Sequence, residues 1–150
     1  MNKTDRRYQM YLDILQEELL PALGCTEPIA VAYAAANARS VLPGAPERLE
    51  VAVSNNIVKN VKSVIVPNTG GLKGIQAAAA IGAVAGNEKL ALEVISSVTE
   101  RDRESLRKFL AEKEILVKPA ESTDVLISAL MRLTAKEITA FAAFKRRIPM

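Results

Sequence analysis

The chain has 150 residues, about one domain's worth, and 49% of them are hydrophobic, which is enough to build a buried core. Aromatic residues make up only 4%, so aliphatic side chains must fill that core, and this favours closely packed helices over aromatic clusters. The net charge of +3 comes from intermixed basic and acidic residues, which argues against a nucleic-acid-binding protein.

Further features of the sequence narrow the class of protein. Residues 1–10 are charged, unlike a secretory signal, and the most apolar stretch, residues 75–85, is too short and too rich in glycine to span a bilayer. A single cysteine allows no internal disulfide, so we expect a cytoplasmic protein without a membrane partner. The chain has no histidine, so any proton transfer must use Lys, Tyr, Cys or a carboxylate.

Two helices are predicted in the first third of the chain. The first covers residues 5–20, because its apolar residues recur at steps of four and three: Tyr8, Leu12, Leu15 and Leu19. Pro21 ends it, since the residue before a proline is pushed out of the helical region. Thr26 is the expected N-cap of the second helix, which continues through an alanine-rich stretch to residue 41 and is ended by Pro43.

The middle of the chain contains both strand and helix patterns. Residues 48–54 alternate between apolar and polar, which predicts a half-buried strand, and a turn is expected at the two asparagines that follow. Residues 64–66 are β-branched and predict a second strand. Residues 72–86 predict a helix of small residues, with a groove for another backbone where glycine or alanine recurs every four positions: Gly74, Ala78, Gly82 and Gly86.

The last third is predicted to hold two helices and a short strand. A helix is expected over residues 88–98, and Thr99 with Asp102 resembles a capping box that opens another over residues 100–113. A short strand follows at residues 115–118, and residues 126–144 have helix-like spacing without a clear strand pattern. The fold class predicted from these elements is α+β, helix-dominated, with a few short strands and an Ala/Gly-rich central helix.

The first candidate functional segment is Gly24-Cys25-Thr26-Glu27-Pro28. Cys25 lies just before a predicted helix, where free backbone N–H groups and the helix dipole would lower the pKa of its thiol. A thiolate there could ligate iron, attack an electrophile or relay a proton. The alternative is that Cys25 is a small buried hydrophobic residue.

The second candidate segment directly follows the strand of residues 48–54. It contains one hydroxyl, three amides and an ammonium group: Ser54, Asn55, Asn56, Lys59 and Asn60. Amides at the end of a strand can bind both the carboxylate and the ammonium of an amino acid. A side-chain-capped turn is the alternative, because asparagine is a favoured turn residue.

The third candidate segment is the glycine-rich loop of residues 67–74, which includes Asn68, Thr69 and Gly70 and leads into a helix. The loop could hold an anion against the N–H groups of that helix. It matches neither the P-loop nor the dinucleotide-binding pattern, so a substrate carboxylate suits it better than a nucleotide. An ordinary turn is the alternative. If the candidate segments form one site, Asn55, Asn60, Asn68 and Thr69 should converge on one pocket beside Cys25.

Three stretches of sequence, LGCTEPIAVAYAAA, VSNNIVKNVKSVIVPNTGGLKG and IGAVAGN, together resemble the L-cysteine desulfidase family, which is related to the alpha part of iron–sulfur L-serine dehydratases. The resemblance covers residues 12–125. It implies a lyase without pyridoxal phosphate that eliminates sulfide from L-cysteine, or water from L-serine, to give pyruvate and ammonia. Family members hold a [4Fe–4S] cluster, of which Cys25 would be one ligand. Cys25 and Lys59 are the candidate catalytic residues, and the asparagine-rich and glycine-rich segments would hold the small amino-acid substrate.

The sequence departs from that family in two respects. It has one cysteine where a cluster needs at least three thiolates, and residues 126–150 do not resemble the family. We therefore predict a truncated N-terminal part of the family's domain over residues 1–125 and a divergent C-terminal extension over residues 126–150. Such a chain would be inactive alone, would hold no stable cluster, and would need a second chain or a homo-oligomer to supply the missing ligands.

Two alternatives differ in class. One is a non-catalytic amino-acid-binding or interaction module of the same fold. The other is a pyridoxal-phosphate lyase that uses Lys59 or Lys73, although such enzymes are much larger than this chain.

Overall fold

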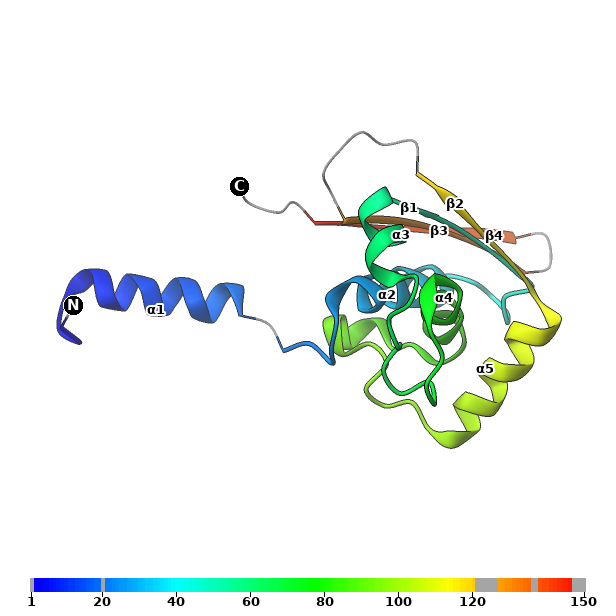
Figure 1. The fold of residues 1–150 in the computed structure, drawn as a ribbon, viewed down its shortest axis with the longest axis horizontal. Helices are drawn as coiled ribbons and strands as arrows, with labels where there is room; N and C mark the ends of the chain where they lie inside the picture. The colour runs from blue at the N-terminus through cyan, green and yellow to red at the C-terminus, as the bar shows by residue number, and fades with distance from the viewer. Residues whose placement is uncertain (1, 20, 121–126, 136–137, 147–150) are drawn as a thin grey trace.

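A four-stranded mixed sheet with helices on one face forms the body of the protein (Figure 1). The computed structural model describes residues 2–19, 21–120, 127–135 and 138–146. The strands lie in the order β2-β1-β3-β4, and their bounds are Arg48–Val53 for β1, Glu114–Pro119 for β2, Ile127–Ala135 for β3 and Ile138–Arg146 for β4. β1 pairs parallel with β2 and antiparallel with β3. The predicted α+β class is confirmed.

Two helices of small residues, α2 (Thr26–Ser40) and α4 (Gly74–Ala85), form the layer under the sheet. Both are buried on most of their circumference, because alanine lets neighbouring backbones approach closely. A Cβ atom added to Gly82 would overlap the carbonyl group of Ala32 on α2. The predicted groove for a second backbone is therefore occupied by α2, and the Ala/Gly-rich central helix is confirmed.

The helix α5 (Glu100–Glu112) begins with the predicted capping box. The Thr99 hydroxyl accepts a hydrogen bond from the Asp102 amide at 3.3 Å, and the Asp102 carboxylate accepts one from the Thr99 amide at 2.8 Å. Leu106 and Phe109 bury the inner face of α5 against the core. The strand β2 then returns the chain to the sheet beside β1.

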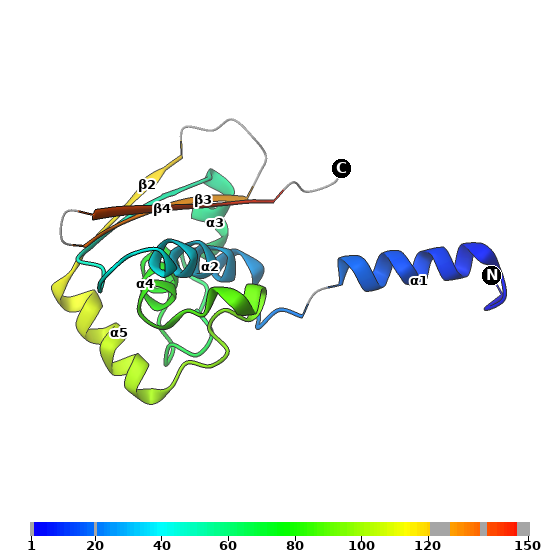
Figure 2. The same ribbon diagram turned by 180° about the vertical axis from the view of Figure 1, so that it is seen from behind.

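The helix α1 (Arg6–Glu18) extends away from the body, as Figures 1 and 2 show from opposite sides. Asp5 caps it by accepting a hydrogen bond from the Arg7 amide at 2.9 Å. None of its residues belongs to the core cluster found in the described part of the chain. Within the same residues, no helix combines the length and the apolar character that crossing a membrane requires.

The structure differs from the prediction after β1, where a helix replaces the expected turn. α3 (Asn55–Val61) begins directly at the two asparagines, with Ser54 as its N-cap. Ile57 and Val61, four residues apart, are both fully buried, so the helical period decides this segment. The β-branched residues 64–66 form a single bridge, between Ile65 and Lys73, and not a full strand.

Two further segments differ from what their sequence patterns indicate. Residues 88–98 contain only the 3-10 helix η1 (Glu88–Glu93), which is interrupted at Ala91, where φ is +47°. Where residues 126–144 have helix-like spacing, the described segments Ile127–Ala135 and Ile138–Arg146 form the antiparallel strands β3 and β4. These residues are strands because β3 pairs with the edge of β1, which is distant in the sequence. That pairing outweighs the local helical periodicity.

Candidate functional site

A cluster of four hydrogen-bonded side chains lies at the N-terminus of α2: Cys25, Thr26, Glu27 and Asn60. The Cys25 thiol donates a hydrogen bond to Oε2 of Glu27, with an Sγ–Oε2 distance of 2.9 Å. From α3, the Asn60 side-chain amide donates to the other oxygen, Oε1, at 3.2 Å. Thr26 Oγ1 lies 3.5 Å from Oε2. Glu27 therefore connects α2 to α3 and holds the thiol beside a carboxylate.

The pKa of Cys25 is raised above its ordinary value, and the chief cause is its hydrogen bond to Glu27, followed by partial desolvation. The pKa of Glu27 is lowered, chiefly because the same hydrogen bond stabilises its charged form. The prediction of a depressed thiol pKa is therefore wrong. The hydrogen bond to Glu27 outweighs the effect expected from the helix dipole.

The Cys25 side chain is exposed, so it is not the small buried hydrophobic residue of the alternative interpretation. Cys25 itself occupies the N-cap position of α2, one residue before the expected Thr26, and its side chain makes no capping hydrogen bond. This arrangement keeps the thiol protonated and places a proton acceptor next to it. Because the thiolate is the reactive form of cysteine, this neighbour lowers the reactivity of Cys25.

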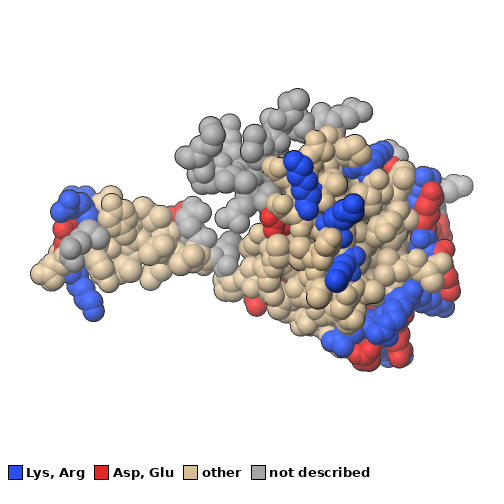
Figure 3. Space-filling view, in the orientation of Figure 1, with Lys and Arg blue, Asp and Glu red and all other residues tan. Residues whose placement is uncertain are grey.

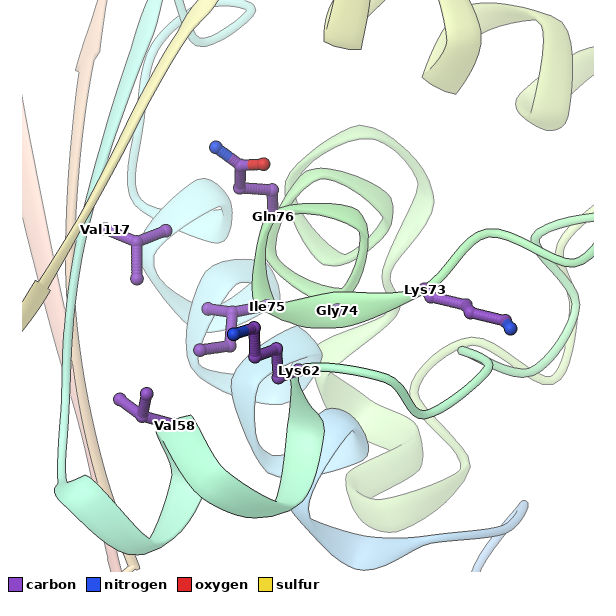
Figure 4. A pocket seen from close by; sticks show the side chains of 7 residues that line it. All are labelled: Val58, Lys62, Lys73, Gly74, Ile75, Gln76 and Val117. Carbon is purple, nitrogen blue, oxygen red and sulfur yellow. The ribbon is translucent and has the colours of Figure 1, made fainter.

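A second feature is a cavity of about 380 Å³ between α3, α4 and β2, which we call the α3–α4 pocket (Figure 4). The residues that line it are Val58, Lys62, Lys73, Gly74, Ile75, Gln76 and Val117. In Figure 4 the Lys62 side chain extends in the direction of Val58, Ile75 and Val117, whereas the Lys73 side chain extends to the opposite side. Gln76 donates a hydrogen bond to the Ile115 carbonyl of β2 at 3.4 Å. The pocket therefore has an apolar wall and two lining lysines, of which Lys62 extends towards that wall.

The surface around the α3–α4 pocket is basic. Figure 3 shows blue Lys or Arg side chains over α3 and the start of α4 with no red Asp or Glu side chain between them. The basic residues of this part of the chain are Lys59, Lys62 and Lys73, all exposed. Within the described residues, no ion pair joins any of them to an acidic side chain. Their field would favour an anion at the pocket.

The helix α3 separates the two features because its faces carry different residues. Val58 and Lys62 lie four positions apart and line the pocket, whereas Asn60 contacts Glu27. Ile57 and Val61 lie on a third face, in the core. The thiol cluster and the pocket are thus distinct sites on either side of one short helix.

Asn68 and Thr69 hold the loop that precedes α4. Thr69 is buried; its hydroxyl donates to the Val66 carbonyl at 2.7 Å and accepts from the Leu72 amide at 3.1 Å. The Asn68 side-chain amide donates to the Ile95 carbonyl at 2.9 Å. The loop still approaches the thiol cluster, because a Cβ atom added to Gly24 would lie 3.1 Å from Cγ of Pro67. Asn60 is thus joined to Cys25 through Glu27, whereas the side chains of Asn68 and Thr69 hydrogen-bond to backbone groups near their own loop.

The remaining predicted site residues neither line the pocket nor hydrogen-bond to the thiol cluster within the described residues. Asn55, Asn56 and Lys59 are exposed on α3, and Gly70 is exposed in its loop with φ of +76°. The Ser54 hydroxyl is buried at the N-cap of α3 and has no hydrogen-bond partner among the described residues. None of these residues lines the α3–α4 pocket.

Sequence reasoning missed Glu27 as a site residue, together with Val58, Lys62, Ile75 and Val117 of the pocket. The four-residue spacing of Val58 and Lys62 indicates that they share one face of the chain only if residues 55–61 are predicted to be a helix. Val117 reaches the pocket through the pairing of β2 with β1, which no local pattern reveals.

The residues present do not fit a [4Fe–4S] cluster. The sequence has one cysteine, and no three His, Cys, Asp or Glu side chains of the described segments gather as ligands of a metal. Three thiolates at least are needed for such a cluster.

The chain is similar to bacterial proteins named UPF0597. One from Desulfitobacterium hafniense (strain Y51) is 52% identical over 131 residues, which cover 85% of this chain and 30% of that protein. One from Treponema denticola is 46% identical over 136 residues, with 91% and 31% covered, and one from Finegoldia magna is 46% identical over 137 residues, with 91% and 33% covered. The chain thus spans about a third of the length of these curated relatives. No protein-family model matches it.

These comparisons correct the family prediction. The relatives are named UPF0597 proteins, and none of the three names mentions a cysteine desulfidase or a serine dehydratase. The resemblance assigned from the sequence is therefore corrected to similarity with UPF0597 proteins. Three predictions depended on that resemblance and are therefore also wrong: an iron–sulfur lyase, a role in cysteine catabolism and a truncated fragment of that lyase.

Proposed function

We propose that this chain binds a small organic monoanion, such as a short-chain carboxylate, in the α3–α4 pocket. One observation carries the proposal: an apolar wall formed by Val58, Ile75 and Val117 lines the same pocket as Lys62, whose side chain extends towards it in Figure 4. An aliphatic tail against the wall and a carboxylate against the ammonium would satisfy both parts of the pocket.

The size of the pocket favours a small ligand. Its volume of about 380 Å³ lies near the lower end of the range for small-molecule sites, roughly 300–1,000 Å³. Each methylene group that leaves water for the apolar wall would contribute about 0.8 kcal/mol. A few carbon atoms are therefore enough for measurable binding, and a nucleotide or a peptide would extend beyond the lining residues.

The charges favour a simple acid over an amino acid. Lys62 provides a cation, and no acidic side chain belongs to the lining residues of the pocket. The carboxylate of an amino acid would find a partner there, whereas its ammonium group would lie beside another cation. Because Lys62 is exposed, its ion pair with a ligand is worth about 1 kcal/mol or less.

The test is a titration of ¹⁵N-labelled protein followed by amide chemical shifts, with sodium butyrate as the probe. We expect shifts centred on Val58, Gly74 and Ile75, and weaker binding of butyramide, which lacks the charge, and of 2-aminobutyrate, which adds an ammonium group. Equal affinity for butyrate and butyramide would show that the pocket does not select anions, and shifts located elsewhere would contradict the site.

Two lysine variants provide a matched pair. Lys62→Ala should weaken butyrate binding about fivefold, the equivalent of roughly 1 kcal/mol, and should remove its dependence on salt. Lys73→Ala should leave the affinity nearly unchanged, because that side chain extends away from the apolar wall. The proposal is refuted if the two variants have the same affinity as each other.

A further inference from the structure

The helix α1 exposes several large apolar side chains to solvent. Met10, Tyr11, Ile14 and Leu15 are 48–56% exposed, and Leu19, the C-cap residue, is 68% exposed. In Figures 1 and 2 the helix stands clear of the other described elements. A helix of 13 residues is marginal on its own in water, so α1 needs a partner surface.

The spacing of the apolar residues fits another helix as that partner. Tyr8, Leu12 and Leu15, followed by Leu19 at the cap, are separated by four, three and four positions. This spacing is the one by which two helices pack along a narrow seam.

The charges of α1 indicate that the partner helix is a second copy of α1. Arg6 lies in the first turn and Glu17 in the last, and neither has an ion-pair partner within the described residues. The first turn holds no acidic residue and the last turn no basic residue, which is opposite to the arrangement that the helix dipole favours. A second α1 that runs antiparallel would place the acidic end of one helix beside the basic end of the other. A parallel copy would place like charges together.

We propose that α1 is a self-association surface through which two copies of this chain pair with their α1 helices antiparallel. The contact is short, because 13 residues of helix extend only about 20 Å. The dimer should therefore be weak and dependent on concentration. Each copy would supply Arg6 to one end of the pair and Glu17 to the other.

Sedimentation equilibrium of the whole chain, from roughly 10 µM to roughly 1 mM, tests the proposal. The average mass should rise from monomer towards dimer across this range. Leu15→Glu should abolish the rise, because it places a charge in the seam. Lys108→Glu on exposed α5, the control charge reversal, should leave it unchanged.

The charge arrangement has its own test. Arg6→Glu and Glu17→Arg should each prevent self-association, although each improves the match of α1 to its own dipole. An equimolar mixture of the two variants should associate, since both ends of a mixed antiparallel pair then join opposite charges. A chain that stays monomeric throughout, a Leu15→Glu variant that still associates, or a mixture no better than its components would each overturn the proposal.

Discussion

At the N-terminus of α2, the carboxylate of Glu27 accepts hydrogen bonds from the Cys25 thiol and the Asn60 amide. Two residues of separation along the chain bring Cys25 and Glu27 together, and the helix start fixes their orientation. The result is a thiol that stays protonated at a pH where an ordinary cysteine has begun to ionise, because its pKa is raised by that hydrogen bond. The reactivity of Cys25 therefore depends on one neighbour more than on the helix dipole.

Replacing Glu27 with Gln should increase the reactivity of Cys25 at a given pH. Removal of the negative charge lets the pKa of the thiol fall towards its ordinary value, so the thiolate forms at lower pH and the whole alkylation profile shifts down. The measurement is the rate of iodoacetamide alkylation against pH. Asn60→Ala, which contacts only the other carboxylate oxygen, should shift the profile less. A shift of the Glu27→Gln profile to higher pH would disprove the role of this carboxylate.

Among the elements, α2 and α4 show how closely two backbones can approach when one position carries no side chain. A Cβ atom on Gly82 would overlap the Ala32 carbonyl, and a Cβ atom on Gly86 would lie 2.7 Å from the Cβ atom of Ala36. The pocket-lining residues Gly74 and Ile75 open the same helix, so this crossing also positions the α3–α4 pocket.

Gly82→Ala should destabilise the protein by about 3 kcal/mol, because the added methyl group forces α2 and α4 apart in a close-packed core. In a free helix the same substitution would stabilise by about 1 kcal/mol. The free energy of unfolding in urea measures the effect. Lys108→Ala, at an exposed position of α5, is the control and should change stability by less than about 0.5 kcal/mol. A stability for Gly82→Ala equal to that of the unmodified protein would show that the helices are not in close contact.

Elements defined by short-range signals could be predicted from the sequence, and those defined by distant pairing could not. The capping box of Thr99 and Asp102 spans four residues and locates the start of α5 correctly. By contrast, the antiparallel strands β3 and β4 depend on the edge of β1, about 80 residues earlier, and the local spacing of this part of the sequence suggests a helix. α3 was missed because its asparagines favour turns, although Ile57 and Val61 share a buried face.

In the candidate site, too, contacts between neighbours in the sequence could be predicted and contacts between distant residues could not. The neighbours Cys25 and Glu27 stand in one motif of the sequence, whereas the contact of Asn60 with Glu27 joins residues 33 positions apart. Lys62 and Val117 meet at the pocket only because β2 pairs with β1. Polar residues that look like ligands in the sequence, such as Thr69, turned out to bond within a loop, since a buried hydroxyl must find a partner nearby.

At the scale of the whole molecule, the described chain consists of a body and a helix that contributes nothing to its core. The core cluster contains residues from α2 to α5, the sheet and the segments between them, and none from α1. The transition lies near Leu23, which packs against the core and whose amide donates to the Leu92 carbonyl at 3.4 Å. The body should therefore keep its stability without the residues that precede this contact.

Deletion of residues 1–21 should change the melting temperature by less than about 2 °C, because no buried apolar contact is lost. The measurement is thermal unfolding followed by circular dichroism at a concentration where the full chain is monomeric. Leu23→Ala in the full chain is the comparison. It removes a side chain that packs against the core, and it should lower the melting temperature by several degrees, equivalent to about 1 kcal/mol. If the deletion is as damaging as Leu23→Ala, α1 must pack against the body in solution, and its apolar stripe would then no longer be free to pair with a second copy.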